Sequence, residues 1–442
     1  MDHNKKIIIG SGLAGPLLAI CLSQRDYSVK LFEKRSDPRI NDISAGRSIN
    51  LALSHRGIKA LKHADVFTEV EPHLIPMKGR MIHHLSGKLE FQSYSIHSNE
   101  YINSVSRSRL NKILMSKAET LGKVKIFFNH SLKKVDESNN KLIFENGNST
   151  SISGHVFGAD GAGSIIRKHI DEKVVSPSYS DALGHGYKEL HIAPGKEGTF
   201  QLDPNALHIW PRNKFMLIAL PNTDQSFTCT LFMPVKGDES FDSLDTPDAI
   251  THFFQTYFKD VLPLLENFPE TYFENPIGNL ATVYADNWEY DNRFCLIGDA
   301  AHAIVPFFGQ GMNASFEDCQ IFVKCLDESN DNWDNIFNSY NTVRKIDADA
   351  IAQMAIENYI EMRDLVTRKD FIQKKVISAQ LSKQYPKQFI PRYNMVSFTS
   401  IPYSEVYKRG NIQKKIISKL DIDSPDLNSV KDMIHKQLTF LS

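Results

Sequence analysis

The chain has 442 residues, a formal net charge of −1, 41% hydrophobic and 23% charged residues. This length predicts two or three domains with a sizeable core, and the balanced charge excludes a global field that would attract nucleic acid. The five cysteines lie in apolar contexts without metal-ligand spacing, so we expect neither a disulfide framework nor a metal site. No leader is visible, and no apolar run approaches the roughly 18 residues of a membrane span, so we expect a cytoplasmic protein.

The first predicted element is a nucleotide-binding turn. A β-branched run at 5–9 leads directly into three spaced glycines, Gly10, Gly12 and Gly15, and apolar residues then recur at helical spacing. A second strand at 28–32 ends at Glu33, an acid placed to accept from a ribose hydroxyl. Because Glu33 would repel a 2′-phosphate, the turn favours FAD or NAD over NADPH.

The next stretches alternate between strands and helices. Residues 1–65 predict a βαβ unit followed by a helix after His55, and residues 124–170 return to short strands. The second stretch ends in GADGAGSIIR, which places Asp160 between a strand and a helix. In this motif Gly163 and Arg167 suit a groove shared by FAD and a pyridine nucleotide. Residues 180–285 predict an antiparallel sheet that could cover a substrate.

Between the first two of these stretches, residues 80–94 predict a hairpin. Arg80 and Tyr94 are equidistant from Gly87, and SGK at 86–88 is a plausible three-residue loop. In that register the two residues are cross-strand partners on one face. A guanidinium beside a phenol could receive an amino-acid carboxylate, and a surface arginine over a tyrosine is the alternative.

The segment RFCLIGDAAHAIVPFFGQGMN, residues 293–313, predicts a strand, a Gly-Asp turn and a loop ending at a helix N terminus. Such a loop aims backbone N–H groups at an electron-rich ligand, and with the N-terminal turn it indicates a flavin dinucleotide. Helical patterns dominate from about 312. The last 76 residues carry 14 Lys/Arg against 6 Asp/Glu, which favours a solvated basic face over a docking surface.

The motifs GSGLAG, GADGAG and RFCLIGDAAH together resemble the signature of the flavoprotein aromatic hydroxylases, the class with the para-hydroxybenzoate hydroxylase fold. Five further stretches resemble the kynurenine 3-monooxygenases: GRSINLALSHRG (46–57), IPMKGRMIHHLSG (75–87), SVSRSRLN (104–111), IVPFFGQGMNASFED (304–318) and ENYIEMR (357–363). The resemblance implies an α/β fold in which a Rossmann-type FAD-binding domain is interleaved with an antiparallel-sheet substrate domain, plus a C-terminal helical region. The expected bounds are 1–70, 103–178 and 290–330 for the FAD-binding domain, 71–102 and 179–289 for the substrate domain, and 331–442 for the helical region.

The resemblance also implies site residues. For FAD it implies Ala52, Arg107, Leu132 and Asp299, with Met312 and Asn313 beside the isoalloxazine. The expected FAD contacts are completed, beyond the three glycines and Glu33, by Ala14, Lys34, Arg35, Asp160, Pro306, Gly309 and Gly311. For the substrate it implies Arg80, Tyr94, Asn358 and Tyr393. From the residues alone, a solvent-exposed Asn358 and a core Tyr393 are equally acceptable.

The implied reaction is hydroxylation of L-kynurenine to 3-hydroxy-L-kynurenine with FAD, NADPH and O2, through a C4a-hydroperoxyflavin. The flavin carries the chemistry, so no catalytic side chain is expected, and His83, His84 and His302 are interpreted as non-catalytic. Without a second glycine fingerprint, NADPH is expected to bind transiently in a groove. Eukaryotic members of the family end in a membrane-anchoring helix, and this chain stops at Ser442 without one, so we expect a bacterial-type enzyme.

Three alternatives remain from the sequence. The nearest is a sister hydroxylase acting on another aromatic acid. A halogenase or reductase on the same FAD domain is disfavoured, because Trp210, Trp288 and Trp333 are too far apart for a Trp-x-Trp motif. A non-catalytic flavin-binding protein is the third. Monomer and dimer are equally compatible with the sequence.

Overall fold

The computed structural model describes residues 4–40, 50–329 and 332–441. Its contacts divide the chain into two compact units: unit 1 is Met1–Leu74, Val105–Leu183 and Ala281–Ala352, and unit 2 is Ile75–Ser104, Gly184–Leu280 and Gln353–Ser442. Residues 331–352 therefore group with the predicted flavin segments, and the rest of the C-terminal region groups with unit 2. The first four residues of the 46–57 motif lie outside the described residues.

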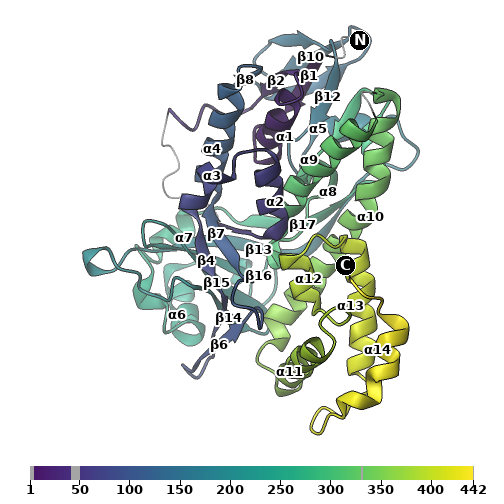
Figure 1. The fold of residues 1–442 in the computed structure, drawn as a ribbon. Helices are drawn as coiled ribbons and strands as arrows, with labels where there is room; N and C mark the ends of the chain where they lie inside the picture. Colours follow the sequence, from purple (N-terminus) through teal and green to yellow (C-terminus); the bar gives the residue numbers. More distant parts are fainter. Residues whose placement is uncertain (1–3, 41–49, 330–331, 442) are drawn as a thin grey trace. The chain divides into compact units, whose positions relative to one another are not determined.

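Unit 1 is built on a six-stranded sheet in the order β18-β19-β12-β1-β2-β8 (Figure 1). The strands are β1 (Lys5–Ile9), β2 (Ser28–Phe32), β8 (Val124–Phe127), β12 (His155–Gly158), β18 (Glu289–Tyr290) and β19 (Phe294–Leu296). All neighbours pair in parallel except β18 and β19. Strands buried on both faces read as continuous apolar runs, which is how β1 and β19 appear in the sequence.

Helices complete unit 1. They are α1 (Ala14–Ser23), α2 (His55–His63), α3 (Phe67–Val70), α4 (Arg107–Thr120), α5 (Ile165–Asp171), α8 (Asp299–His302), α9 (Gly311–Glu328), the part of α10 (Trp333–Ile360) up to Ala352, and the short turns η1 (Glu71–His73) and η5 (Pro306–Phe308). Strand β3 (Asn50–Leu53) precedes α2, and β9 (Leu132–Asp136), β10 (Lys141–Phe144) and β11 (Ser149–Ser151) form a small antiparallel sheet. α1 packs on both α4 and α9, and one apolar core joins these helices to the sheet.

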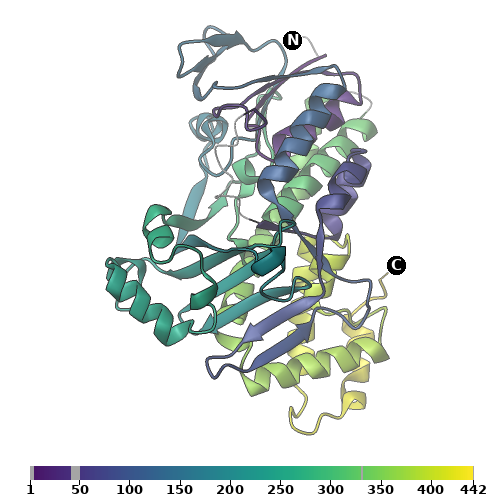
Figure 2. The same cartoon turned by 90° about the vertical axis from the view of Figure 1, so that its left-hand side faces the viewer.

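Most of a seven-stranded sheet, in the order β17-β13-β16-β15-β14-β5-β6, belongs to unit 2. Its teal strands are visible in Figure 2. Its strands are β5 (Gly79–His83), β6 (Leu89–Ser93), β13 (Tyr179–Ile192), β14 (Ala206–Arg212), β15 (Phe215–Pro221), β16 (Phe227–Pro234) and β17 (Gly278–Tyr284). β14 pairs with β5 in parallel, and β5 pairs with β6 in an antiparallel hairpin. Helices α6 (Pro247–Tyr257) and α7 (Glu270–Glu274) share an apolar core with the sheet, and β4 (Ile75–Met77) pairs with β7 (Ile102–Ser106).

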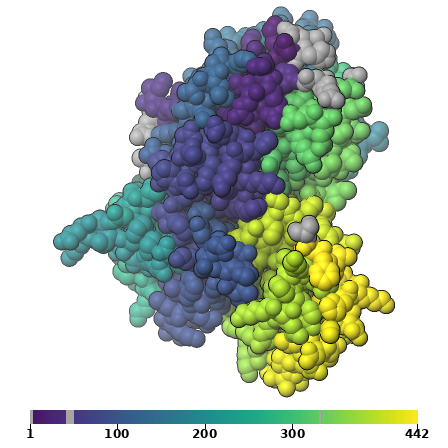
Figure 3. Space-filling model, in the orientation of Figure 1, coloured from purple at the N-terminus to yellow at the C-terminus, as the bar shows by residue number. Residues whose placement is uncertain are grey.

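The C-terminal part of unit 2 is helical. After α10 the chain forms η6 (Glu361–Leu365), which is one π-helical turn, then α11 (Lys369–Gln384), α12 (Arg392–Phe398), α13 (Tyr403–Ile417), η7 (Leu427–Val430) and α14 (Lys431–Gln437). α11, α13 and α14 bury a separate apolar cluster, and α13 and α14 form a yellow area of the surface in Figure 3. In the described part of the chain, no helix combines the length and apolarity needed to span a bilayer.

The predicted register of the β5–β6 hairpin is wrong by one residue in the loop. Arg80 pairs with Gln92, and Tyr94 instead donates its backbone N–H to the carbonyl of Lys78 at 3.1 Å. The loop is LSG, because the N–H of His84 bonds to the carbonyl of Lys88 and closes the turn one residue earlier than SGK would. The two-residue offset preserves side-chain parity, so Arg80 and Tyr94 still share a face as diagonal neighbours.

Candidate functional site

The nucleotide-binding turn of unit 1 is held from two sides. The Ser11 N–H donates to the Glu33 carboxylate at 2.7 Å, and Asn111 on α4 donates its side-chain amide to the carbonyls of Ser11 and Gly12. Arg35 binds Glu33 through its backbone N–H and its guanidinium, at 3.0 and 2.7 Å. Burial alone would raise the pKa of Glu33, but these bonds outweigh it and hold the pKa below its ordinary value. Glu33 therefore stays an anionic acceptor at the end of β2.

A side chain would have different consequences at two glycines of this turn. A Cβ on Gly10, which has φ +102°, would lie 2.3 Å from the carbonyl oxygen of Ala159. A Cβ on Gly12 would meet nothing within 4 Å. Gly10 thus lets β1 approach the GADGAG motif, whereas Gly12 borders open space where a ligand can approach the backbone. α1 starts beside this space, and no described side chain caps its N terminus, which suits a pyrophosphate.

The GDAAH turn joins the same place. Gly298, with φ +65°, is so closely packed that a Cβ would lie 3.3 Å from Cβ of Ala14 and 2.8 Å from Oγ of Ser315. Asp299 follows and is exposed. Arg167 of the GADGAGSIIR motif donates to the carbonyl of Ala300 at 2.7 Å. The three motifs, far apart in the sequence, therefore meet around the start of α1.

The loop before α9 is fixed by one amide. Asn313 accepts the N–H of Ser54 at 2.9 Å and donates to the carbonyls of Ala52 and Gly309, both at 2.8 Å. The N terminus of α9 has no side-chain cap among the described residues. Asn313 is fully buried, and its amide ties Ser54, Ala52 and Gly309 together before α9.

The other predicted FAD contacts fall into three groups. Arg107 is exposed one helical turn before Asn111 on α4, hence on the side that faces the turn. Lys34 and Pro306 are exposed, whereas the Leu132 side chain belongs to the apolar core of unit 1. Asp160 accepts the N–H of Ile165 at 2.7 Å at the start of α5, and burial raises its pKa. The residues present fit an FAD: an acidic ribose acceptor, open space at Gly12 and two uncapped helix N termini.

Unit 2 buries a guanidinium among aromatic rings. The rings of Tyr94 and Tyr393 stack with centroids 4.8 Å apart, and the guanidinium carbon of Arg80 lies 5.7 and 5.2 Å from their centroids. Arg80 is 4% exposed, and its Nε is buried without a hydrogen-bond partner among the described residues. The Tyr94 hydroxyl likewise makes no hydrogen bond of ordinary geometry with a described residue. Buried donors without a protein partner are rare, and water or a ligand usually completes them.

The counter-ion of Arg80 is Glu361, the first residue of η6. Nη1 of Arg80 lies 3.3 Å from Oε1 of Glu361, and Nζ of Lys375 on α11 lies 3.6 Å from the same oxygen. Burial alone would raise the pKa of Glu361, but Lys375 and Arg80 hold it below its ordinary value. The carboxylate is thus charged and shared by two cations.

Tyr393 comes to this cluster from α12, and Asn358 lies on α10, the helix that leads into η6. Asn358 is 4% exposed, one turn before Glu361, and its amide lies 3.3 Å from Sδ of Met362. Asn358 is therefore buried, contrary to the exposed alternative. π-Helical turns such as η6 occur frequently at functional sites, because they re-aim side chains from a regular helix.

A second buried network lies on the same sheet. His83 bonds through Nδ1 to Asp260 and through Nε2 to Nδ1 of His208, both at 2.9 Å, and His208 bonds through Nε2 to the carbonyl of Asp203. A carbonyl only accepts, so His208 donates from Nε2 to Asp203 and accepts at Nδ1 from Nε2 of His83. Burial lowers the pKa of His208 to about 4, consistent with a neutral ring. The network anchors β5 three residues after Arg80.

Sequence reasoning missed three residues that complete these sites: Asn111, Glu361 and Lys375. Asn111 and Glu361 stand inside SVSRSRLN and ENYIEMR, so the motifs were visible but their contacts depend on tertiary structure. Lys375 had no signal in a basic helical stretch. In the described part of the chain, no group of three His, Cys, Asp or Glu residues is arranged to hold a metal ion.

Sequence comparison finds a matching family and several relatives. Residues 4–355 match the family described as FAD binding domain. The chain is 42% identical to kynurenine 3-monooxygenase of Myxococcus xanthus, over 98% of this chain and 95% of that protein. It is 43% identical to kynurenine 3-monooxygenase of Dictyostelium discoideum, over 97% and 95% of the two chains.

Solved structures show the same fold at lower identity. 2-Methyl-3-hydroxypyridine-5-carboxylic acid oxygenase matches with a TM-score of 0.67 and 18% identity, over 83% of this chain and 95% of that chain. PqsL of P. aeruginosa in complex with 2-aminobenzoylacetate matches with a TM-score of 0.64 and 17% identity, over 82% and 98%. These matches confirm the predicted α/β fold.

Proposed function

The chain belongs to the family of FAD-dependent kynurenine 3-monooxygenases, and we propose that the buried cluster around Arg80 is its L-kynurenine site. The protein hydroxylates L-kynurenine to 3-hydroxy-L-kynurenine and consumes NADPH and O2. When bound, FAD takes electrons from NADPH and activates O2, so the chain has to bind, orient and shield. We further propose a cytoplasmic location, supported by five cysteines that are all free thiols.

The observation that carries the site is the incomplete hydrogen bonding of Arg80. A guanidinium offers five donors in a planar fork, and here Nη1 makes one long bond while Nε has no partner among the described residues. A substrate carboxylate would accept from the fork, and the Tyr94 hydroxyl would add a donor. The stacked tyrosines restrict the side chain, which reduces the entropy lost when the ligand binds.

Glu361 suits the other charge of an α-amino acid. Kynurenine is a zwitterion whose ammonium lies two bonds from its carboxylate, so a receptor needs an anion beside the guanidinium. Glu361, charged and 3.3 Å from Arg80, provides it. An aromatic acid without an ammonium would place its own carboxylate near that of Glu361 with no cation between them. The repulsion between the two anions disfavours such substrates.

Flavin-absorbance titrations with L-kynurenine test the site. Truncating one partner of a buried charge pair typically costs about 2 to 5 kcal/mol, so Arg80→Ala should raise the kynurenine Kd by roughly thirtyfold or more. Arg80→Lys should recover only part of the affinity, because a point charge does not reproduce the fork. Tyr94→Phe should cost about 0.5 to 1.5 kcal/mol. FAD content should remain that of the wild type. Wild-type kynurenine affinity in Arg80→Ala would remove Arg80 from the site.

A further inference from the structure

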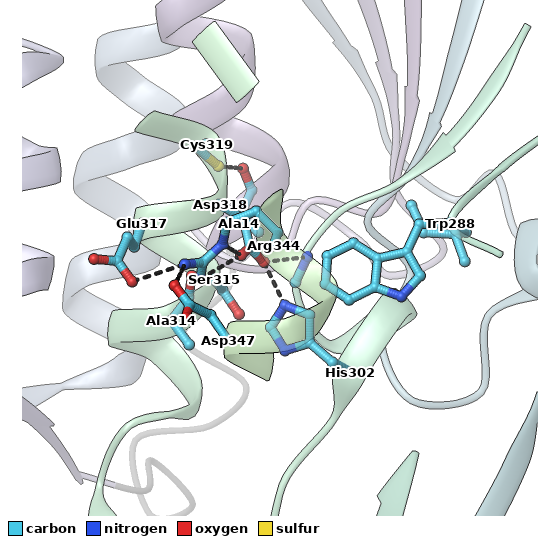
Figure 4. A network of polar contacts seen from close by, with 12 residues as sticks. Ala14, Trp288, His302, Ala314, Ser315, Glu317, Asp318, Cys319, Arg344 and Asp347 are labelled. Atoms are coloured by element: carbon cyan, nitrogen blue, oxygen red, sulfur yellow. Dashed lines mark hydrogen bonds and ion pairs between the residues drawn. The ribbon is translucent and has the colours of Figure 1, made fainter. Parts of the chain in front are cut away.

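One guanidinium at the centre of unit 1 is surrounded by carboxylates. Arg344 on α10 is fully buried and contacts Asp318 at 2.8 Å, Glu317 at 3.0 Å and Asp347 at 3.4 Å (Figure 4). Arg56 on α2, also buried, contacts Glu317 from the other side at 2.6 Å. Charges so far from solvent are retained only where each is paired, and this network ties α2, α9 and α10 together.

Asp318 extends the network to the GDAAH turn. Its Oδ2 accepts the backbone N–H of Gly298 at 3.0 Å and Nε2 of His302 at 2.6 Å, while Oδ1 accepts from Arg344 at 2.9 Å. His302 points at Asp318, and its ring stacks on Trp288 at 5.0 Å between centroids (Figure 4). One carboxylate oxygen therefore holds both ends of the short helix α8.

The segment between those two anchor points carries the exposed Asp299. Gly298 has a positive φ of 65° and packs against Ala14 of α1 and Ser315 of α9, so its position is defined on both sides. A shift of the Asp318 carboxylate would move the turn relative to the two uncapped helix N termini. Asp318 and Arg344 can therefore affect ligand binding through the position of the turn, without touching the ligand themselves.

We propose that Asp318, held in place by Arg344, is a positioning residue for FAD: it maintains the Gly298–His302 turn in the conformation that presents Asp299 and the start of α9 to the flavin. The inference rests on the assignment of Asp299 to the flavin site. It does not depend on the cluster around Arg80. A negative result in the Arg80 titrations would contradict the kynurenine site, and a negative result in the experiment below would contradict the role of Asp318.

The test measures FAD binding and apoprotein stability side by side. Asp318→Asn keeps the size but removes the charge, and turns an amide donor towards Arg344 or His302. FAD affinity, from fluorescence quenching on titrating apoprotein, should fall by about tenfold to a hundredfold, the range that one hydrogen bond to a charged group provides. The visible circular dichroism of the bound flavin should also change, because the turn beside it has moved.

Asp347→Asn is the matched control. It removes the same charge from the same guanidinium, but Asp347 contacts Arg344 within α10 itself, at i, i+3. It should lower the unfolding temperature of the apoprotein. The flavin spectrum should stay that of the wild type, and the FAD dissociation constant should change by less than about twofold, which corresponds to roughly 0.4 kcal/mol.

A second variant covers the case in which Asp318→Asn does not fold. His302→Phe keeps the stacking on Trp288 and removes the hydrogen bond to Asp318, and it should weaken FAD binding in the same direction with the same spectral change. The proposal is overturned if either folded variant binds FAD like the wild type with an unchanged spectrum. It is also overturned if Asp347→Asn weakens FAD binding as much as Asp318→Asn, since the network would then serve stability alone.

Discussion

At the scale of single residues, the two sites each contain a buried guanidinium, and they differ in how completely the protein pairs it. Arg80 has a long bond to Glu361 and an unused Nε, whereas Arg344 is saturated by three carboxylates. Because an unsatisfied buried donor is costly, the first arrangement favours an incoming anion and the second favours rigidity. We therefore propose that the same residue type receives a ligand in unit 2 and holds a turn in unit 1.

Glu361→Gln should separate recognition of the ammonium from recognition of the carboxylate. The substitution keeps the shape and removes the charge, so the L-kynurenine Kd should rise by about tenfold, the effect of losing roughly 1.4 kcal/mol of ion pairing. A desamino analogue, which has the carboxylate but no ammonium, should bind as well as before or better. Flavin-absorbance titrations with both ligands check this. Equal losses for the two ligands would contradict a role for Glu361 in binding the ammonium.

His208 should make the stability of unit 2 depend on pH. Burial lowers its pKa from 6.5 to about 4, so between these values the unfolded chain binds a proton that the folded chain does not. Stability is therefore complete above about pH 6.5 and falls as pH decreases towards 4, by up to about 3 kcal/mol. His83, Asp260 and the Asp203 carbonyl are the groups that face the ring network.

Denaturant unfolding at a series of pH values measures this dependence. A His208→Gln variant should be less stable at pH 7 because its hydrogen bonds are imperfect, but its stability should change less between pH 6.5 and 4 than that of the wild type. Parallel pH profiles for the two proteins would show that another group carries the dependence.

At the scale of elements, local patterns predicted the strands and helices that carry the motifs. β1 and β2 begin and end where the apolar runs do, and α9 begins one residue before the expected Met312. The hairpin register failed because three-residue loops starting at Leu85 or Ser86 are both compatible with the sequence, and cross-strand pairing decides between them. Contacts such as Glu361 with Arg80 could not be predicted, since residues 281 positions apart share no local pattern.

The glycine turn offers a test that separates folding from ligand binding. Gly12→Ala should leave the unfolding temperature of the apoprotein nearly unchanged, because the new methyl group meets nothing within 4 Å. It should weaken FAD binding by about tenfold or more, since the methyl group occupies the path of the pyrophosphate. Gly10→Ala is the contrasting variant and should destabilise the apoprotein, because its Cβ would overlap the carbonyl of Ala159. Unchanged FAD affinity in Gly12→Ala would place the pyrophosphate elsewhere.

At the scale of the whole molecule, each site draws on segments that are distant in sequence but belong to one unit. The turns proposed to hold the flavin come from the three segments of unit 1, and the cluster proposed to bind kynurenine comes from the first and last segments of unit 2. The basic C-terminal stretch also has internal uses that its composition did not reveal. Arg409 is buried and donates to the carbonyls of Gln388 and Thr439, both at 2.8 Å, and Lys414 pairs with Glu357 at 2.6 Å.

This separation predicts that the two ligands protect different parts of the chain from hydrogen exchange. A ligand at about 100 times its Kd stabilises the bound state by about 2.7 kcal/mol, so amides that open only after release should exchange about a hundredfold more slowly. FAD added to the apoprotein should protect the turns at 10–15 and 298–313 in unit 1. L-Kynurenine added to the holoenzyme should protect η6 and α12 in unit 2. The Arg80→Ala variant should lose the second protection and keep the first. Protection by kynurenine that spares η6 and α12 would move its site away from Arg80, whatever the affinity of the variants, because binding to this cluster must slow the opening of the segments that form it.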